Sequence, residues 1–405
     1  MTRRGPHTGP ARYPAPLERL ARVLWPEGPE GPLDHRVRWV EDLPGGLPAG
    51  TERYAAIPSP THPAFLLPLD APPRVRARLL RHYNHLRTDR RRVQRLALAG
   101  LAAVGLPPAR GRLLVVPPGP RASLREVVAD AIGVPAGDLV LSVAVRPGTG
   151  PLTPTVTVVD TTGTPRVFVK VADTPETRAE LQAEHDVLVA MRQPAGSPVL
   201  VPGPVFRLEW DGALVVGIEP LPLDVRRVEV DELDAVQPFL DALVASRPVS
   251  ALGLEESPWT ARLRSVAASL PPEAAAPLSA AVDAAVARHA GTTFPHGLRH
   301  GDWSCWNMAR SAEAGGLAVW DWEFSEPSAP LGLDRCNWHF AFDTGVRGLS
   351  TAESAARLRA LPAEVADPRL RELYLLDMAA RRSALGAGGE EASARWAREL
   401  LAELA

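Results

Sequence analysis

The sequence predicts an α+β fold of two lobes, a small antiparallel-sheet lobe and a larger helical lobe, preceded by an extra N-terminal α/β region. Short apolar runs separated by Gly and Pro turns begin at residue 138 and predict strands. Beyond Pro222 the pattern is mainly helical, except around residues 297–324, where short strands flank two acidic motifs. These observations divide the chain into residues 1–137, 138–222 and 223–405.

Composition narrows the class of protein. The chain has 405 residues, 45% of them apolar, and a net charge of -2, so no global field attracts nucleic acid. Two cysteines, Cys305 and Cys336, exclude a disulfide framework and are too few for a cysteine-based zinc site. The longest apolar stretch, Leu96 to Leu106, is far short of the roughly 20 residues of a membrane span and predicts a core helix. We therefore expect a cytoplasmic protein.

Residues 1–72 are rich in Pro and Gly, and the runs Tyr54–Ile57 and Phe65–Leu69 predict small strands. Residues 74–106 predict a helix or helix pair, with nine arginines between Arg74 and Arg95. This segment either contacts an anionic glycan or membrane surface or is simply a solvated helix. Its candidate buried positions are Leu79, Leu80, Leu86, Val93 and Leu96.

A strand is predicted at Arg112–Val116, and Ser123 with Glu126 forms a capping box for a helix that ends near Gly133. The sheet lobe follows as a predicted antiparallel meander, one helix and a hairpin that turns at Asp211-Gly212. The strands of this lobe are Leu139–Val145, Thr155–Asp160, Val167–Val171, Val205–Glu209 and Ala213–Ile218, and its helix is Glu176–Met191.

The strongest motif is the run from His300 through Gly301 and Asp302 to Asn307. The step from Asp302 to Asn307 equals the Asp-to-Asn step of the catalytic loop H-R-D-x-x-x-x-N, and Asp321 follows an apolar strand shortly afterwards. Phosphoryl transfer requires the protein to align an acceptor and to neutralise the phosphates. In that chemistry Asp302 accepts the acceptor's proton, while Asn307 and Asp321 offer hard oxygen ligands to Mg²⁺.

Lys170 is the only lysine among 45 basic residues, and it lies in an apolar strand. Its charge is suited to phosphate, and the next helix offers Glu184 as an ion-pair partner, with Glu180 one turn earlier as the alternative. A lone strand lysine is usually a surface residue, but its uniqueness here favours a function.

Residues 138 to about 385 resemble the aminoglycoside phosphotransferase and choline kinase family, which has a protein-kinase-like fold. The resemblance rests on His300-Gly301-Asp302 with Asn307 and on Asp321-Trp322-Glu323. It implies that Asp302 is the catalytic base, that Lys170 binds ATP phosphates and Glu184 positions it, and that Asn307 and Asp321 bind magnesium. It further implies that Asp334 steadies the catalytic loop.

The family's nucleotide loop maps to residues 146–153, where Gly148 and Gly150 let the backbone approach phosphate, although a plain hairpin is equally compatible. Glu219 and Leu221, in the linker after the hairpin, are expected to contact adenine through the backbone. Cys305 stands where many relatives have proline.

Two other kinds of site are considered. His296 and His300 are four residues apart, but neighbouring glycines argue against a helical zinc pair. Cys305 has no evident base or orienting partner for nucleophilic chemistry.

The predicted function is an ATP- and Mg²⁺-dependent phosphotransferase acting on a small-molecule hydroxyl, such as a sugar, an aminoglycoside or an amino alcohol. The alternative is an inactive nucleotide-binding pseudokinase or scaffold in a biosynthetic or cell-surface polysaccharide pathway. Protein-kinase activity is disfavoured because no Ala-Pro-Glu-like segment follows Glu323. The sequence leaves the acceptor and the choice of ATP or GTP open.

Overall fold

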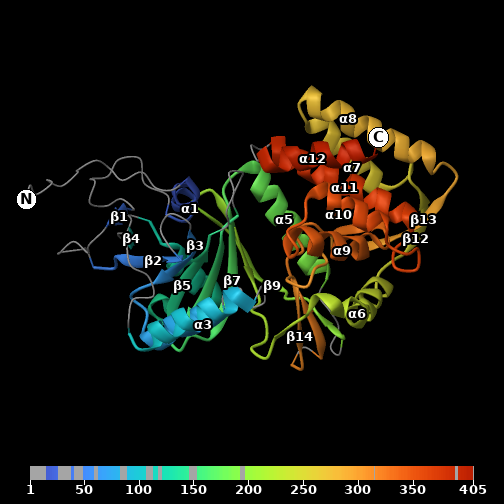
Figure 1. Cartoon of the computed structure of the whole chain (residues 1–405). Helices are drawn as coiled ribbons and strands as arrows, with labels where there is room; N and C mark the ends of the chain where they lie inside the picture. The colour runs from blue at the N-terminus through green and yellow to red at the C-terminus, as the bar shows by residue number, and fades with distance from the viewer. Residues whose placement is uncertain are drawn as a thin grey trace, which may run out of the picture. The chain divides into compact units, whose positions relative to one another are not determined.

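The computed structural model describes residues 15–25, 38–40, 49–58, 63–82, 89–105, 113–116, 121–145, 153–191, 197–313, 315–387 and 391–404. The chain divides into two compact units, which we describe separately. The sheet unit comprises Met1–Leu181 and Pro204–Pro220, and the helical unit comprises Gln182–Gly203 and Leu221–Ala405. The predicted α+β class is confirmed, since strands dominate the first unit and helices the second (Figure 1).

The sheet unit is built on one antiparallel sheet in the order β1-β4-β2-β3-β5-β6-β7-β10-β9. Its strands are β1 (Arg38–Val40), β2 (Glu52–Pro58), β3 (Pro63–Pro68), β4 (Leu113–Val116), β5 (Leu139–Ala144), β6 (Thr155–Asp160), β7 (Pro165–Ala172), β9 (Pro204–Trp210) and β10 (Ala213–Ile218). The first four strands precede residue 138, and β3 pairs with β5 through Phe65 opposite Ala144. The sheet is therefore larger than the sequence suggested, and the separate role expected of residues 1–137 stays a prediction.

Alternation along the strands gives this sheet two apolar faces. On β2, Tyr54 and Ala56 pack in a core with α1 (Ala15–Leu24) and α4 (Leu124–Ile132). Ala55 and Ile57 point to the other side and pack in a core with α2 (Pro73–His82) and α3 (Asp89–Ala103). Helices therefore bury both sides of the sheet.

The predicted local signals are present in the sheet unit. Ser123 and Glu126 form the capping box of α4, and Gly133 ends that helix with φ 70°. The β9–β10 hairpin turns at Asp211 and Gly212, both of which have positive φ. The meander β5–β6–β7 and the helix α5 (Pro175–Ala190) also confirm the prediction.

The arginine-rich segment forms the predicted helix pair, α2 and α3, which Figure 1 shows beside the sheet. Leu79 and Leu80 are buried, as expected. Val93 and Leu96 were also expected to be buried, but this prediction is wrong, because they are 67% and 51% exposed. The reason is that α3 meets its neighbours through alanines such as Ala99, which allow close approach and leave the larger residues outside.

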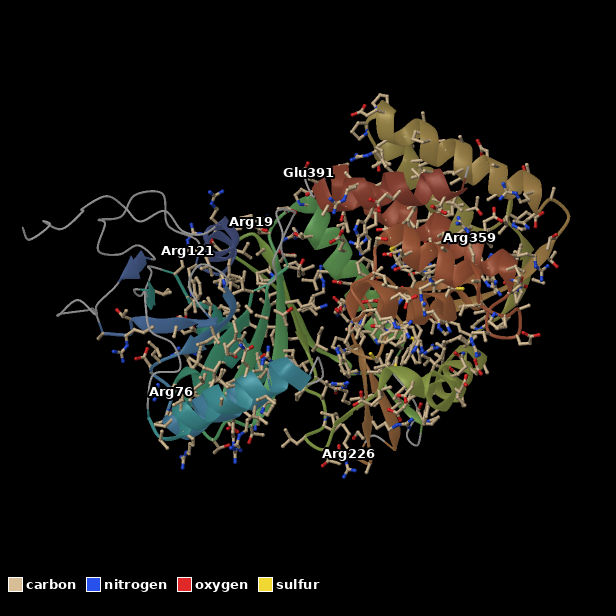
Figure 2. The ribbon with its side chains drawn as sticks, viewed as in Figure 1. Arg19, Arg76, Arg121, Arg226, Arg359 and Glu391 are labelled. Carbon is tan, nitrogen blue, oxygen red and sulfur yellow. The ribbon has the colours of Figure 1, made fainter. Side chains whose placement is uncertain are left out.

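Leu86 lies outside the described residues. Figure 2 labels Arg76, one of the arginines of α2. The contact of residues 74–95 with an anionic glycan or membrane stays a prediction.

The helical unit places α11 at its centre. Residues 373–380 are all buried, so the middle of this helix is covered on every side, and it packs against α7, α8, α9, α10 and α12. The helices that lie wholly in this unit are α6 (Leu233–Ala245), α7 (Pro258–Ser269), α8 (Pro272–Arg288), α9 (Leu333–Gly345), α10 (Thr351–Arg359), α11 (Pro368–Ala387) and α12 (Glu391–Leu404). Among the described helices of the chain, none combines the length and apolarity needed to cross a bilayer.

Two small sheets complete the helical unit, in the orders β11-β14-β15-β8 and β12-β13-β16. Their strands are β8 (Val199–Leu200), β11 (Arg226–Arg227), β12 (Ser250–Gly253), β13 (Thr293–Arg299), β14 (Met308–Ser311), β15 (Gly316–Val319) and β16 (Glu326–Pro330). The two acidic motifs lie at the ends of these strands.

Candidate active site

A hairpin brings the two acidic motifs together. The loop 300–307 runs from β13 to β14, and β14 pairs antiparallel with β15, with Met308 opposite Val319. Asn307 precedes one strand of this hairpin and Asp321 follows the other. The Trp320 amide donates to the Asn307 carbonyl at 3.1 Å, so the pairing continues to the motif residues themselves.

The loop backbone is held by Asp334, the second residue of α9. Its two carboxylate oxygens accept hydrogen bonds from the backbone amides of His300 and Gly301, each at 2.8 Å. Gly301 has φ 84°, and a side chain there would place a Cβ 2.0 Å from the Phe324 carbonyl oxygen. The loop therefore requires glycine at this position, and Asp334 makes the contacts expected of a residue that steadies it.

His300 connects the loop to the second motif. Its Nδ1 accepts the Asp302 amide at 3.1 Å, which leaves Nε2 as the protonated nitrogen that donates to the Trp320 carbonyl at 3.0 Å. The ring also packs on Trp322, with centroids 4.5 Å apart. The histidine thus holds the loop against the second motif.

The Asp302 carboxylate is partly buried and faces amides. Asn307 Nδ2 donates to its Oδ2 at 2.7 Å, and Asn337 Nδ2 lies 3.3 Å from its Oδ1. Burial raises the pKa of Asp302, and the nearby Asp321 charge raises it further, whereas His300 and the two amides lower it. The charge of Asp321, which follows β15, therefore acts on the Asp302 carboxylate.

Asp321 has φ 66°, a left-handed conformation that is uncommon for a residue other than glycine. Such strain is held in place only by its surroundings and is concentrated at functional sites. The side-chain nitrogen of Asn307 donates hydrogen bonds to Asp302. The side-chain oxygen, Oδ1, is therefore the atom of Asn307 that can bind a cation. An amide oxygen and a carboxylate are hard donors, which fits Mg²⁺.

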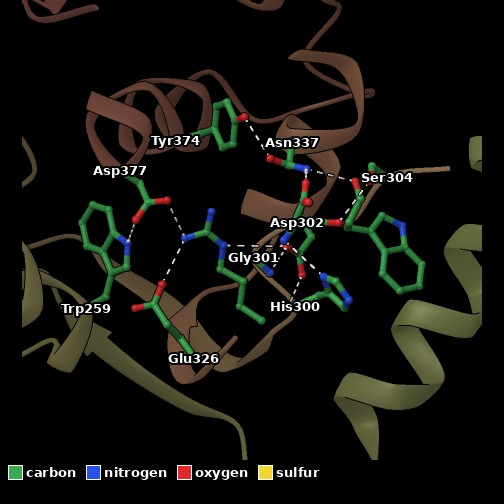
Figure 3. A network of polar contacts seen from close by, with 12 residues as sticks. Trp259, His300, Gly301, Asp302, Ser304, Glu326, Asn337, Tyr374 and Asp377 are labelled. Atoms are coloured by element: carbon green, nitrogen blue, oxygen red, sulfur yellow. Dashed lines mark hydrogen bonds and ion pairs between the residues drawn. The ribbon is translucent and has the colours of Figure 1, made fainter. Parts of the chain in front are cut away.

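A buried ionic network lies behind the loop (Figure 3). Asp377 of α11 contacts Arg299 at 2.9 Å, Arg381 at 3.1 Å and also Arg262, while Trp259 Nε1 donates to it at 3.3 Å. Arg381 in turn donates to the Gly301 carbonyl at 2.7 Å. The central helix therefore contacts the loop 300–307 directly.

Lys170 lies on β7 with 7% of its surface exposed. It stands opposite Val216 of β10, and two residues further on Ala172 packs in one cluster with Val216 and Leu181 of α5. Residues at alternate positions share a sheet face, so Lys170 is on the face that α5 covers. On α5, Glu184 is 3% exposed whereas Glu180 is exposed to solvent.

Other predicted positions are less defined. Gly148 and Gly150 lie outside the described residues. Glu219 is exposed and Leu221 is half-buried just after β10. The roles of these four residues stay predictions, as does the pairing of Lys170.

The geometry argues against the two rival sites. His296 is fully buried in β13, and its ring contacts the Ser257 hydroxyl at 2.7 Å and the Phe294 carbonyl at 2.9 Å, so it is a satisfied core histidine. Burial raises the pKa of Cys305 to about 11, which keeps its thiol protonated and poorly nucleophilic.

Sequence reasoning missed the residues that approach the loop from α9 and α11. Asn337 and Tyr374 are the main examples, and both are buried polar residues, the first in α9 and the second in α11. Such a residue must find a hydrogen-bond partner, which was the available signal, but the partner itself cannot be read from the sequence.

Solved structures of other proteins resemble this chain. No match was found among curated proteins. Among solved structures, a protein described as a fructosamine-3-kinase from Haemophilus somnus has 13% identity and a TM-score of 0.43, covering 69% of this chain and 96% of its own. An ethanolamine kinase from Plasmodium vivax has 9% identity and a TM-score of 0.41, covering 81% and 93%. A spectinomycin phosphotransferase, solved with ADP and spectinomycin, has 9% identity and a TM-score of 0.36, covering 66% and 91%.

The family comparison covers the hairpin and the loop described above. Residues 145–331 match the model of the phosphotransferase enzyme family, and this segment includes Lys170, Asp302, Asn307 and Asp321. Over this segment the chain is similar to the phosphotransferase enzyme family.

Proposed function

We propose that this protein transfers the γ-phosphoryl group of ATP, with Mg²⁺, to a hydroxyl group of a small molecule such as a sugar, an aminoglycoside or an amino alcohol. The observation that carries the proposal is the Asp302 carboxylate, held by amides beside a second carboxylate on a strained residue. General bases and metal ligands of phosphoryl transfer require this combination.

In the proposed reaction Asp302 accepts the proton of the acceptor hydroxyl as the new O–P bond forms and the bond to ADP breaks. Asn307 and Asp321 would hold magnesium, which neutralises charge on the phosphates when bound. Lys170 would bind the nucleotide phosphates, with Glu184 rather than the exposed Glu180 as its partner. The buried position of Glu184 supports that choice, because a buried carboxylate needs a partner.

A small acceptor is favoured because the chain has little room for a protein-substrate platform. After Glu323, β16 begins at Glu326 and α9 at Leu333, so no long activation segment intervenes. In protein kinases that segment lies between the metal-binding triplet and the Ala-Pro-Glu motif.

The test is an acceptor screen. The full chain is incubated with Mg²⁺ and either ATP or GTP against panels of sugars, amino alcohols and aminoglycosides, and phosphorylated product is detected by mass spectrometry. We expect product with at least one acceptor. A protein whose melting temperature rises with nucleotide, but which yields no product from any class, would instead be the nucleotide-binding alternative.

Lys170 permits a separate test of the nucleotide site. Its amine is the only lysine amine in the chain, so an ATP-derived acyl phosphate should acylate Lys170, with the N-terminal amine as the only amine competitor. Excess Mg-ATP should protect it. Lys170→Arg should lower turnover at least about tenfold, or roughly 1.4 kcal/mol, because a planar guanidinium cannot replace a compact ammonium. Peptide mapping that finds ATP-insensitive labelling, together with full activity of Lys170→Arg, would move the nucleotide site elsewhere.

A further inference from the structure

Both oxygens of the Asp302 carboxylate face side-chain amides from different parts of the helical unit. Asn307, in the loop itself, donates to Oδ2. Asn337, which lies one turn into α9, directs its Nδ2 to Oδ1 and also donates to the Trp303 carbonyl at 3.1 Å. Asn337 is 2% exposed, so water does not compete for these contacts. Figure 3 shows Asn337 between Asp302 on one side and Tyr374 on the other.

Tyr374 determines which end of the Asn337 amide faces the loop. Its hydroxyl lies 3.0 Å from Asn337 Oδ1, and Tyr374 is fully buried in α11. The other end of the amide meets the Trp303 carbonyl and the Asp302 carboxylate, which are both acceptors. A flipped amide would set oxygen against oxygen twice, so the orientation is determined by chemistry. Burial raises the pKa of Tyr374 well above its ordinary value, so the hydroxyl keeps its proton and donates.

We propose that Asn337 is a positioning residue for Asp302, with the Tyr374 hydroxyl holding the Asn337 amide in the donating orientation. The proposal rests on the assigned role of Asp302 in phosphoryl transfer. It adds a link from the central helix α11, through α9, to the atom that receives the acceptor's proton.

The physical need for this link lies in the aspartate side chain. Its terminal torsion has a broad, roughly two-fold distribution, so a carboxylate held at one oxygen can still rotate. The second amide restricts that rotation and leaves lone pairs in a defined direction for the acceptor hydroxyl. A base that is already aligned before the reaction lowers the activation barrier, because its side chain loses no further conformational freedom in the transition state.

A simpler reading is that Asn337 serves only the Trp303 carbonyl and thereby the fold of the loop. The two readings differ in what happens to the Asp302 side chain when the loop backbone remains intact. Tyr374→Phe is the mildest probe, because it deletes one hydroxyl and keeps the ring, which packs edge-on against Phe340 at 5.6 Å. Asn337→Ala is the stronger probe.

The chain offers a matched control in Tyr54. It is also a buried tyrosine, and its hydroxyl donates to Glu52 at 2.6 Å, but it lies in the sheet unit on β2. Tyr54→Phe therefore removes a buried hydroxyl hydrogen bond of similar kind without touching Asn337. It reports the general effect of such a loss on stability.

The first measurement does not depend on activity. Crystal structures of the full chain and of the three variants show the orientation of the Asp302 carboxylate. We expect it to be turned or multiply oriented in Asn337→Ala, shifted in Tyr374→Phe and unchanged in Tyr54→Phe. An unchanged carboxylate in both Asn337→Ala and Tyr374→Phe would overturn the proposal, whether or not the protein phosphorylates any acceptor.

The second measurement is a double-mutant cycle on turnover. We expect Asn337→Ala to lower kcat by about 10- to 100-fold, with the KM for nucleotide unchanged, which is the range for residues that orient a reacting group. Tyr374→Phe should cause a smaller loss, and that loss should vanish in the Asn337→Ala background because Tyr374 acts through Asn337. Additive losses would contradict the link. If no variant, including the natural sequence, makes product while the carboxylate still turns, the positioning stands and the proposed reaction fails.

Discussion

Replacing Asp302 with asparagine is expected to lower turnover by about 10²- to 10⁴-fold while leaving nucleotide binding nearly intact. Asparagine has the same shape, but its amide cannot accept the proton of the acceptor hydroxyl. Lys170, Asn307 and Asp321, which are proposed to contact phosphate and magnesium, are all retained, and Asn307 Nδ2 can still donate to the backbone carbonyl of residue 302. Turnover is measured with the acceptor found in the screen, and binding by the rise in melting temperature with Mg-ATP.

Two comparison variants sharpen this result. Asp321→Ala should instead abolish magnesium-dependent nucleotide binding, because it removes a proposed metal ligand and not the base. Asp283→Asn, at an exposed residue of α8 paired with Arg264 at 3.2 Å, should change neither quantity. Near-normal turnover of Asp302→Asn on the true acceptor would refute the role assigned to this carboxylate.

The largest loss of stability is expected from Asp377→Asn. The carboxylate is fully buried and contacts three arginines, of which Arg299 is itself only 2% exposed. Asparagine can still accept from Trp259, but it removes one of the two carboxylates, Asp377 and Glu326, that all three guanidinium groups contact. A buried charge left without any partner costs about 3–5 kcal/mol, and because Glu326 still compensates part of the charge here, we expect a loss of up to that size. Urea denaturation of the full chain, followed by tryptophan fluorescence, measures the difference.

The pH dependence of this contribution has a definite sign. Although burial acts to raise it, Arg299, Arg381 and Arg262 hold the pKa of Asp377 well below its ordinary value. A lowered pKa means that the stabilisation is complete above about pH 4 and is lost as the pH falls toward the pKa of the folded state. Asp283→Asn is again the control, since exposed ion pairs contribute little. Equal urea midpoints for the two variants would contradict the importance of the network.

The site elements that are close in sequence could be predicted from the sequence. Asp302 and Asn307 are five residues apart in one loop, and Asp321 follows the next hairpin, so their proximity depends on local strand pairing that apolar alternation and turns already specify. The capping box at Ser123 and the turn at Asp211 were predictable for the same reason, because each depends on hydrogen bonds within a few residues.

Burial on the surface helices could not be predicted in the same way. Val93 and Leu96 have large apolar side chains that are typical of a core, yet α3 packs against its neighbours through its alanines. The choice between the two faces depends on how closely α2 and the sheet approach α3, which is a property of packing. The joining of β3 to β5 likewise depends on a pairing across more than 70 residues of sequence, and no local pattern specifies its partner.

The sequence by itself therefore determined the α+β class, the order of the elements, and the loop and hairpin that carry Asp302, Asn307 and Asp321, because short-range hydrogen bonding and strand alternation suffice for these. Only the tertiary structure decided which distant groups surround that loop. Asn337 reaches it from α9, while Tyr374 and Asp377 of α11 contact Asn337 and Arg299 beside it. They do so because a buried polar group must be satisfied by whatever partner packing brings within reach, and that partner depends on the whole arrangement of the helices.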